Sequence, residues 1–306
     1  MIDLRQLEAL RAVALEGSVA RAAKLLGWSH PTLDYHLHNL DRLVGEPTTV
    51  RGPRGTKLTT VGQLLLERGR EILTLTDLAL ADARELTQMG RVRLRVGMFP
   101  TAAAALLPAT VARLASVDIQ VDTVLNELGP LVNAANHREV DAALVYSIPG
   151  HRLALREDVH TVEVMRDPMH LALPAHHRLA NRPSIDRATL LSLYDEPWLL
   201  GAATDDPIDR VATDAFAAAG HRINPVIRTD DFQVMLAMIA AGVVIGLVPK
   251  LAMGTHYSGV SFVPIDDPAF TRTILLATPR PSVATAPSAA MKHLVAALRH
   301  AIQATD

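Results

Sequence analysis

The fold of this chain is decided by two segments, which read SVARAAKLLGWSHPTL over residues 18–33 and RGPRGTKLTT over residues 51–60. Gly27 ends the first helix of this stretch, because glycine accepts the left-handed backbone angles of a helix terminus. Ser29 can cap a second helix, and Pro31 is tolerated in its first turn, where backbone amides lack helical partners. We therefore predict two short helices joined by a tight turn.

The second helix has one apolar face and one polar face. Apolar residues recur at intervals of four, three and four positions, which is the spacing of one helix face. They are Leu33, Leu37, Leu40 and Val44, and the opposite face carries Pro31, Tyr35, His38, Asn39 and Arg42. This pattern alone also fits an ordinary amphipathic helix with a solvated polar face. The basic hairpin predicted over residues 51–60 favours a winged helix-turn-helix, which places one helix in the major groove of DNA.

Many positions in the first 62 residues share the ordered pattern of one family. They are Leu4, Arg5, Gln6, Leu7, Gly17, Ser18, Arg21, Ala22, Ala23, Leu25, Leu26, Ser29, Pro31, Leu33, Leu40, Gly45, Arg54, Gly55, Leu58, Thr59 and Gly62. With these residues the sequence resembles the amino-terminal domain of LysR-type transcriptional regulators. The resemblance implies that double-stranded DNA is a partner.

We predict DNA contacts from the second helix and from the hairpin. The candidates on the helix are Ser29, His30, Pro31, Thr32, Asp34, Tyr35 and His38, and those on the hairpin are Arg51, Arg54 and Lys57. The helix departs from the family, whose usual glutamine before the proline is His30 here, and whose usual serine and arginine are Asp34 and Tyr35. Asp34 weakens the attraction to phosphate, but it could accept a hydrogen bond from a cytosine amino group. The basic hairpin residues are expected at phosphates, although Arg51 or Arg54 could instead enter a narrow minor groove.

The composition indicates a folded protein without thiol chemistry. The 306 residues are 49% apolar, carry a net charge of −2 and include no cysteine, which excludes disulfides and thiolate catalysis. Residues 1–62 hold eight Lys/Arg and six Asp/Glu, a net charge of +2, so the remainder carries −4. No basic-then-apolar leader opens the sequence, and we therefore expect a cytoplasmic protein. The longest nearly apolar run, residues 234–249, is shorter than the roughly 20 residues of a membrane span, so no membrane partner is expected.

A long helix without proline is predicted over residues 60–89. Apolar residues recur in it every seven positions, at Leu65, Ile72, Ala79 and Leu86. A period of seven is typical of a coiled-coil seam, although a helix packed on its own domain would also place apolar residues on one face. The family resemblance implies that this helix dimerises, giving a homodimer or homotetramer. A twofold axis would then require an inverted-repeat promoter site.

Beyond residue 90 the pattern alternates between short strands and helices, which is typical of a parallel sheet flanked by helices. The expected strands include residues 94–98, 119–124, 142–146, 162–165 and 169–173. This half resembles the effector-binding part of the same family, with two α/β lobes like those of a periplasmic binding protein. The predicted fold class is therefore α/β, with a winged helix-turn-helix, a linker helix and a two-lobed domain. The predicted boundaries are 1–60 for DNA binding, 61–90 for the linker, and 91–306 for the effector domain, with lobe I over about 91–160 and 268–306 and lobe II over about 161–267.

A small-molecule effector is expected in the crevice where strand ends meet helix amino termini. The candidate residues are Phe99, Pro100, Thr101, Ala102, Asn126, Ser147, Gly201, Ala203 and Thr204. Each of them alone could also be part of a helix cap without a ligand. The acids Glu127, Asp205 and Asp206 lie close by. If they point inward they favour an amine or a neutral molecule, and if they are exposed helix-start acids they carry no information about the ligand.

Other classes of function fit the sequence less well. A Gly-x-Ser-x-Gly motif, a Walker motif and a GxGxxG after a strand are all missing, so no enzyme is expected. His36 and His38 are separated by about 200° on a helix and cannot share one ion, so neither a metal nor a cofactor is expected. A solute-binding protein of the periplasmic-receptor type fits the carboxy-terminal half alone. We therefore predict a LysR-type regulator whose promoter contacts are altered by an effector bound between the lobes.

Overall fold

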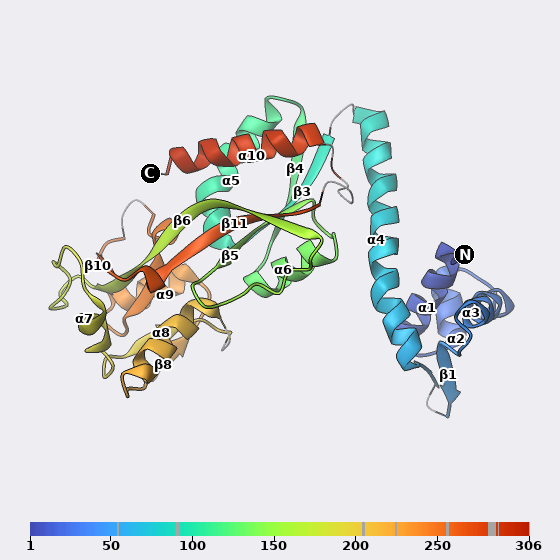
Figure 1. Cartoon of the computed structure of the whole chain (residues 1–306), viewed down its shortest axis with the longest axis horizontal. Coiled ribbons are helices and arrows are strands. Elements are labelled where there is room, and N and C mark those ends of the chain that lie inside the picture. Colours follow the sequence, from blue (N-terminus) through green and yellow to red (C-terminus); the bar gives the residue numbers. More distant parts are fainter. Residues whose placement is uncertain are drawn as a thin grey trace. The chain divides into compact units, whose positions relative to one another are not determined.

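The computed structural model (Figure 1) describes residues 1–53, 55–89, 92–203, 206–223, 225–254, 257–280, 286 and 288–305. The chain divides near residue 90 into two compact units. Among the described residues, none of the helices has the length and apolar character needed to cross a membrane.

The first unit is a helical domain with a hairpin. Its helices are α1 (Leu4–Glu16), α2 (Val19–Leu26), α3 (His30–Val44) and α4 (Thr60–Met89), and the hairpin strands are β1 (Thr49–Gly52) and β2 (Gly55–Leu58). Ser18 and Ser29 cap α2 and α3 with their side chains, and Gly27 ends α2 in the left-handed conformation. The apolar face predicted for α3 is buried, with Leu33 and Leu40 fully inaccessible. The winged helix-turn-helix is confirmed.

The long helix α4 uses two different faces. Leu66 and Leu73 are buried and pack against its own domain, where Gly69 also approaches Leu7. In contrast, Ile72 from the seven-residue repeat stays 45% exposed. Leu65 of the same repeat packs against the core of the helical domain. One face of α4 therefore stabilises its own domain, and pairing of this helix with a second copy stays a prediction.

The second unit is an α/β domain. Its strands are β3 (Val92–Met98), β4 (Ile119–Leu125), β5 (Ala142–Ser147), β6 (Val159–Pro174), β7 (Trp198–Leu200), β8 (Pro225–Arg228), β9 (Gly246–Pro249), β10 (Val260–Pro264) and β11 (Thr271–Pro279). Its helices are α5 (Pro100–Ala115), α6 (Leu128–Asn136), α7 (Arg187–Leu191), α8 (Pro207–Ala218), α9 (Phe232–Ala240) and α10 (Ser288–Gln303). The order in the main sheet is β10-β6-β11-β5-β3-β4, with β9 beside β6.

The main sheet is mixed rather than parallel throughout. Strand β3 pairs in parallel with β4 and β5, as the alternating pattern predicts, and α10 packs on α5 over this lobe. Strands β6 and β11 run antiparallel to their neighbours. Lobe I therefore keeps a parallel core, while the antiparallel strands carry the chain into lobe II.

The two strands expected over 162–165 and 169–173 form one continuous strand, β6 (Figure 1). The sequence favours a break there, because the intervening Asp167 and Pro168 are typical turn residues. In the structure Asp167 pairs across the ladder with Arg272 of β11, and Pro168 pairs with Thr271. The first part of β6 thus belongs to lobe I, and its last part, from Met169 onward, pairs with β9 and β10 of lobe II. The Asp167–Arg272 pair therefore lies where the chain passes between the lobes.

Candidate functional site

The amino-terminal unit presents the start and polar face of α3 at its surface. The Ser29 hydroxyl accepts a hydrogen bond from the Thr32 amide at 3.2 Å, and the two hydroxyl oxygens lie 2.7 Å apart. Tyr35 is 62% exposed although it is a large aromatic residue. In contrast, His36 is buried, and its ring lies 5.1 Å from that of Trp28. The exposed residues of α3 are therefore the ones that the helical period predicts.

Asp34 forms a small ionic network at this surface. Its carboxylate lies 3.3 Å from Nδ1 of His30 and accepts a hydrogen bond from the guanidinium of Arg51 on the hairpin. Nδ1 of His38 lies 2.9 Å from the backbone oxygen of Asp34. The acid that replaces a family hydroxyl therefore joins the start of α3 to the wing. Its negative charge is balanced by Arg51 in the free protein.

The wing is fixed to the helical domain by its backbone. The Thr56 amide donates a hydrogen bond to the Gly17 carbonyl at 2.9 Å. Gly55 has a φ of +114°, and a Cβ atom there would lie 2.3 Å from the Gly17 oxygen. Only glycine allows this close approach. Of the basic hairpin residues, Arg51 and Lys57 are exposed, while Arg54 lies outside the described residues.

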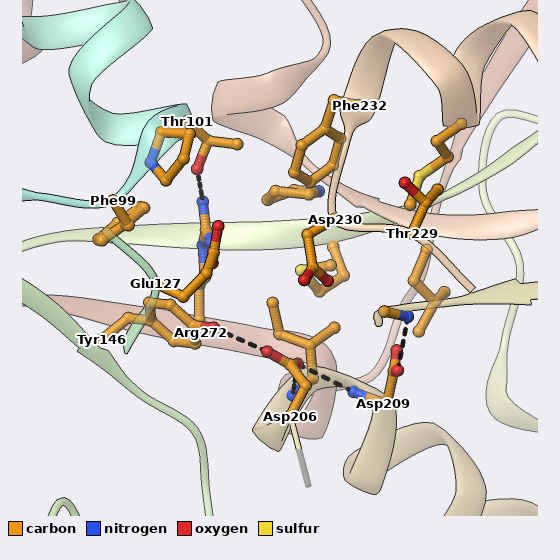
Figure 2. A pocket seen from close by; sticks show the side chains of 17 residues that line it. Phe99, Thr101, Glu127, Tyr146, Asp206, Asp209, Thr229, Asp230, Phe232 and Arg272 are labelled. Atoms are coloured by element: carbon orange, nitrogen blue, oxygen red, sulfur yellow. Dashed lines mark hydrogen bonds between the residues drawn. The ribbon is translucent and has the colours of Figure 1, made fainter. Parts of the chain in front are cut away.

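A cavity of about 70 Å³ lies between the two lobes of the second unit (Figure 2). The predicted residues Phe99, Pro100, Thr101 and Gly201 line it. The remaining lining residues are Glu127, Tyr146, Met169, Asp206, Ile208, Asp209, Thr229, Asp230, Phe232, Met235, Leu247, Pro249 and Arg272. Residues from both lobes thus contribute polar and apolar groups to one small cavity.

Arg272 is the buried cation of this cavity, with 3% of its surface exposed. Its guanidinium binds the fully buried carboxylate of Asp167 at 2.8 Å and donates a hydrogen bond to Oγ1 of Thr101 at 2.9 Å. The guanidinium carbon also lies 4.8 Å and 5.0 Å from the ring centres of Phe99 and Tyr146. Cation–π attraction and the ion pair therefore hold Arg272 in place, with its charge compensated by Asp167.

Four carboxyl groups face the cavity. Asp206 caps α8 by accepting from the Ile208 amide at 2.8 Å, and its second oxygen accepts from the Tyr146 hydroxyl at 3.2 Å across the two lobes. Asp209 accepts from the Gly201 amide at 2.7 Å, and Asp230 accepts from the Ala202 amide at 2.8 Å. The fourth is Glu127, which follows β4. Figure 2 shows these acids around one space.

Burial, together with the neighbouring carboxyl groups, shifts the pKa values of groups in this cavity. Burial, with the carboxylate of Asp206 second, raises the pKa of Asp209 to about 7. Burial also raises the pKa of Glu127, and the charges of Asp230 and Asp206 add to that rise. Burial and Asp206 raise the pKa of the Tyr146 hydroxyl as well, so this group stays a hydrogen-bond donor. The cavity therefore disfavours further negative charge.

Several predicted effector residues do not line the cavity. Ala102 is fully buried in the core of lobe I, Asn126 accepts from the Glu127 amide, and Ala203 is exposed. Ser147 follows Tyr146, and because side chains alternate along a strand it is Tyr146 that reaches the cavity. Thr204 and Asp205 lie outside the described residues.

Of the 17 residues that line the cavity, the strand-end rule placed four in the predicted effector set, namely Phe99, Pro100, Thr101 and Gly201. The missed residues include Tyr146, Asp209, Thr229, Asp230, Phe232 and Arg272. Thr229 and Asp230 directly follow β8, so the same rule could have found them. Arg272 could not be found in this way, because it lies on a returning strand 171 residues after its partner Thr101.

Comparisons with known proteins cover both units. Residues 4–63 match the family described as "Bacterial regulatory helix-turn-helix protein, lysR family", and residues 88–303 match "LysR substrate binding domain". The small neutral protease regulatory protein of Streptomyces coelicolor is 30% identical over 284 residues, which cover 91% of this chain and 83% of the relative. A probable RuBisCO transcriptional regulator of Trichormus variabilis is 31% identical over 193 residues, which cover 62% of this chain and 56% of the relative.

Two solved structures share the fold along nearly the whole chain. A full-length OxyR variant from Pseudomonas aeruginosa superposes with a TM-score of 0.63 at 22% identity, covering 98% of each chain. CbnR in complex with its target DNA gives a TM-score of 0.65 at 21% identity, covering 98% of this chain and 99% of CbnR. At these identities the likeness shows a common architecture.

Proposed function

This chain belongs to the LysR family of DNA-binding transcriptional regulators with an effector-binding domain, and from that premise we propose which of its residues contact DNA and which contact the effector. The observation that carries the proposal is that α3 exposes its polar face beside a docked wing. The homologues are transcriptional regulators, so the alternative of a solute-binding protein without gene regulation does not hold. The family is not generally enzymatic, and we propose that this member catalyses no reaction.

For the DNA contacts we propose different roles for the helix and the wing. The exposed side chains of Tyr35 and His38 lie on the polar face of α3 and would meet base edges in the major groove. Lys57 of the wing would bind a phosphate group. Arg51 would also bind a phosphate group, after its ion pair with Asp34 breaks. Asp34 then acts chiefly through Arg51 and His30, and less as a direct acceptor for cytosine.

For the effector we propose the cavity between the lobes. Tyr146 and Asp206 link the lobes by a hydrogen bond at the cavity wall, so a ligand there would alter an interlobe contact. A ligand shifts the lobes only as far as it binds one arrangement more tightly than the other. Promoter contacts would change because a shift of the lobes would also change the positions of the paired DNA-binding domains.

We propose that residues 1–60 bind DNA, 61–90 pair two chains, and 91–306 bind the effector. The exposed apolar residues of α4, which include Leu64, Ile72 and Leu80, would supply the contact surface of a homodimer or homotetramer. A twofold pair of α3 helices would read an inverted repeat. The site of action is then the cytoplasm, where promoter DNA lies.

The test is a fluorescence-anisotropy titration of the full chain against promoter DNA and random DNA at two salt concentrations. Lys57→Ala should weaken binding to both DNAs and lower the salt slope by about 1, as expected for one phosphate contact. Tyr35→Ala should reduce the preference for promoter over random DNA. Lys292→Ala, a matched charge change on α10 of the effector domain, should leave both quantities unchanged. Equal effects of Lys57→Ala and Lys292→Ala would refute the assigned DNA surface.

A further inference from the structure

The charge of the interlobe cavity indicates what kind of ligand it takes. Among the described lining residues, four carry carboxyl groups and one carries a guanidinium. The guanidinium of Arg272 is already bound to the buried carboxylate of Asp167 at 2.8 Å, so it brings little uncompensated positive charge to a ligand. An anion placed here would face carboxylates from both lobes, and this repulsion would cost free energy in a partly buried site.

The four carboxyl groups differ in how many hydrogen bonds they accept from the protein itself. Asp206, Asp209 and Asp230 accept backbone hydrogen bonds, which explains part of their placement. Within the described part of the chain, the exposed Glu127 has no hydrogen bond to its carboxylate. Partial burial and the charges of Asp230 and Asp206 raise its pKa, while the charge of Arg272 lowers it. Helix capping and loop stabilisation therefore do not account for Glu127. Its position across the cavity from lobe II acids leaves a space that a positive group would satisfy.

A metal ion fits this arrangement poorly. No three His, Asp or Glu side chains of the described residues come together closely enough to hold one ion. A metal such as Ca²⁺ or Mg²⁺ requires six or more oxygen ligands around a single point. An organic ammonium group needs only two or three acceptors, and its carbon chain can contact apolar walls. Met235, Leu247 and Phe232 supply such walls in the same cavity.

The size of the cavity restricts the ligand further. Its volume of about 70 Å³ is well below the roughly 300–1,000 Å³ of pockets for drug-sized molecules. A cavity volume of about 10–15 Å³ is enough for one water molecule, so the space has room for several non-hydrogen atoms, such as an ammonium group with a short carbon chain. Phe232 and Asp230 both line this space (Figure 2), and an aromatic ring together with a carboxylate is a favourable setting for such a cation.

We propose that the effector of this regulator is a small organic amine, bound in its cationic form among the carboxyl groups of this cavity, with Glu127 as one acceptor and the carbon chain against Phe232. This inference rests on the proposed function, because it assigns a chemical class to the effector of the same cavity. Small organic acids are excluded as effectors, because they would require a positively charged pocket.

The test uses three probes of one shape and different charge, namely n-butylamine, n-butanol and butyrate. Each is titrated into the full-length protein by isothermal calorimetry at a pH above the pKa of Asp209. We expect n-butylamine to bind with a millimolar or lower dissociation constant, and we expect no heat of binding for n-butanol or butyrate. Glu127→Gln should weaken n-butylamine at least about tenfold, which corresponds to ~1.4 kcal/mol. Asp195→Asn removes an exposed charge elsewhere on lobe II and should leave the affinity unchanged.

Each contrary outcome has a distinct meaning. Stronger binding of butyrate or n-butanol than of n-butylamine would overturn the assignment to amines while leaving an effector cavity in place. Equal weakening by Glu127→Gln and Asp195→Asn would overturn the location, because only general electrostatics would then be involved. No binding of any probe would overturn the small-amine assignment. In each case promoter binding of the same protein sample, measured by anisotropy, shows independently whether the proposed DNA-binding function stands.

Discussion

The buried ion pair between Asp167 and Arg272 should be the single contact of the effector domain whose loss lowers its stability most. Asp167 is fully buried, and Arg272 is 3% exposed. The two are joined at 2.8 Å where β6 and β11 pass between the lobes. Removing one partner of such a pair leaves an uncompensated buried charge and costs about 3–5 kcal/mol. We therefore expect Asp167→Asn to destabilise the domain by this amount, although the amide oxygen can still accept from the Leu251 amide, which Asp167 binds at 3.1 Å.

A double-mutant cycle separates the pair from its surroundings. Arg272→Met should also destabilise the domain, but the double variant should be more stable than the sum of the single changes predicts, because no buried charge then remains. The assay is urea unfolding followed by tryptophan fluorescence in a Trp28→Phe background, so that the fully buried Trp198 of lobe II is the reporter. If Asp167→Asn lies within about 0.5 kcal/mol of its parent, the range of ordinary surface changes, the account of this pair is wrong.

Three further changes follow from the geometry. Asp34→Asn should raise the affinity for any DNA a few-fold, equivalent to about 0.2–1 kcal/mol, because it releases the exposed Arg51 and removes a negative charge. Anisotropy at low salt measures the affinity, and weaker binding would contradict this expectation. Gly62→Ala should destabilise the DNA-binding domain by ~1–3 kcal/mol in urea unfolding, because the alanine Cβ would lie 2.0 Å from the Thr48 carbonyl oxygen. A stabilising effect of alanine would show instead that the helix adjusts freely. Since the pKa of Asp209 is raised from 3.8 to about 7, the folded state holds a proton that the unfolded state has lost, and stability should fall as pH rises through this window. Asp209→Asn should flatten that part of the pH–stability curve, and an unchanged curve would contradict the raised pKa.

The sequence predicted the DNA-binding unit well because its decisive interactions are local. Caps such as Ser29 and turn glycines such as Gly27 act within a few positions, and the apolar period of α3 selects the buried face directly. The role of Asp34 could not be predicted in this way. Its partner Arg51 is 17 residues away, on a hairpin whose position depends on backbone contacts with Gly17.

The effector cavity was harder to predict because it is assembled from distant segments. Thr101 and Gly201 follow strands and were found from that rule, whereas Arg272 reaches the cavity from the returning strand β11. The continuous strand β6 was also missed, because the tendency of Asp167 and Pro168 to form turns is overridden by pairing with β11. Tertiary contacts of this kind leave no periodic pattern in the sequence.

This protein binds promoter DNA, and we propose that a ligand between its lobes changes the promoter contacts. The most direct measurement is a footprint on DNA immediately upstream of its own gene, at about 50 and 200 mM salt, with and without n-butylamine. We expect protection of two half-sites related by inversion, loss of affinity at the higher salt, and a shift of the protected region when the amine is present. Binding no tighter than to random DNA, or a footprint that ignores a ligand shown by calorimetry to bind, would contradict it.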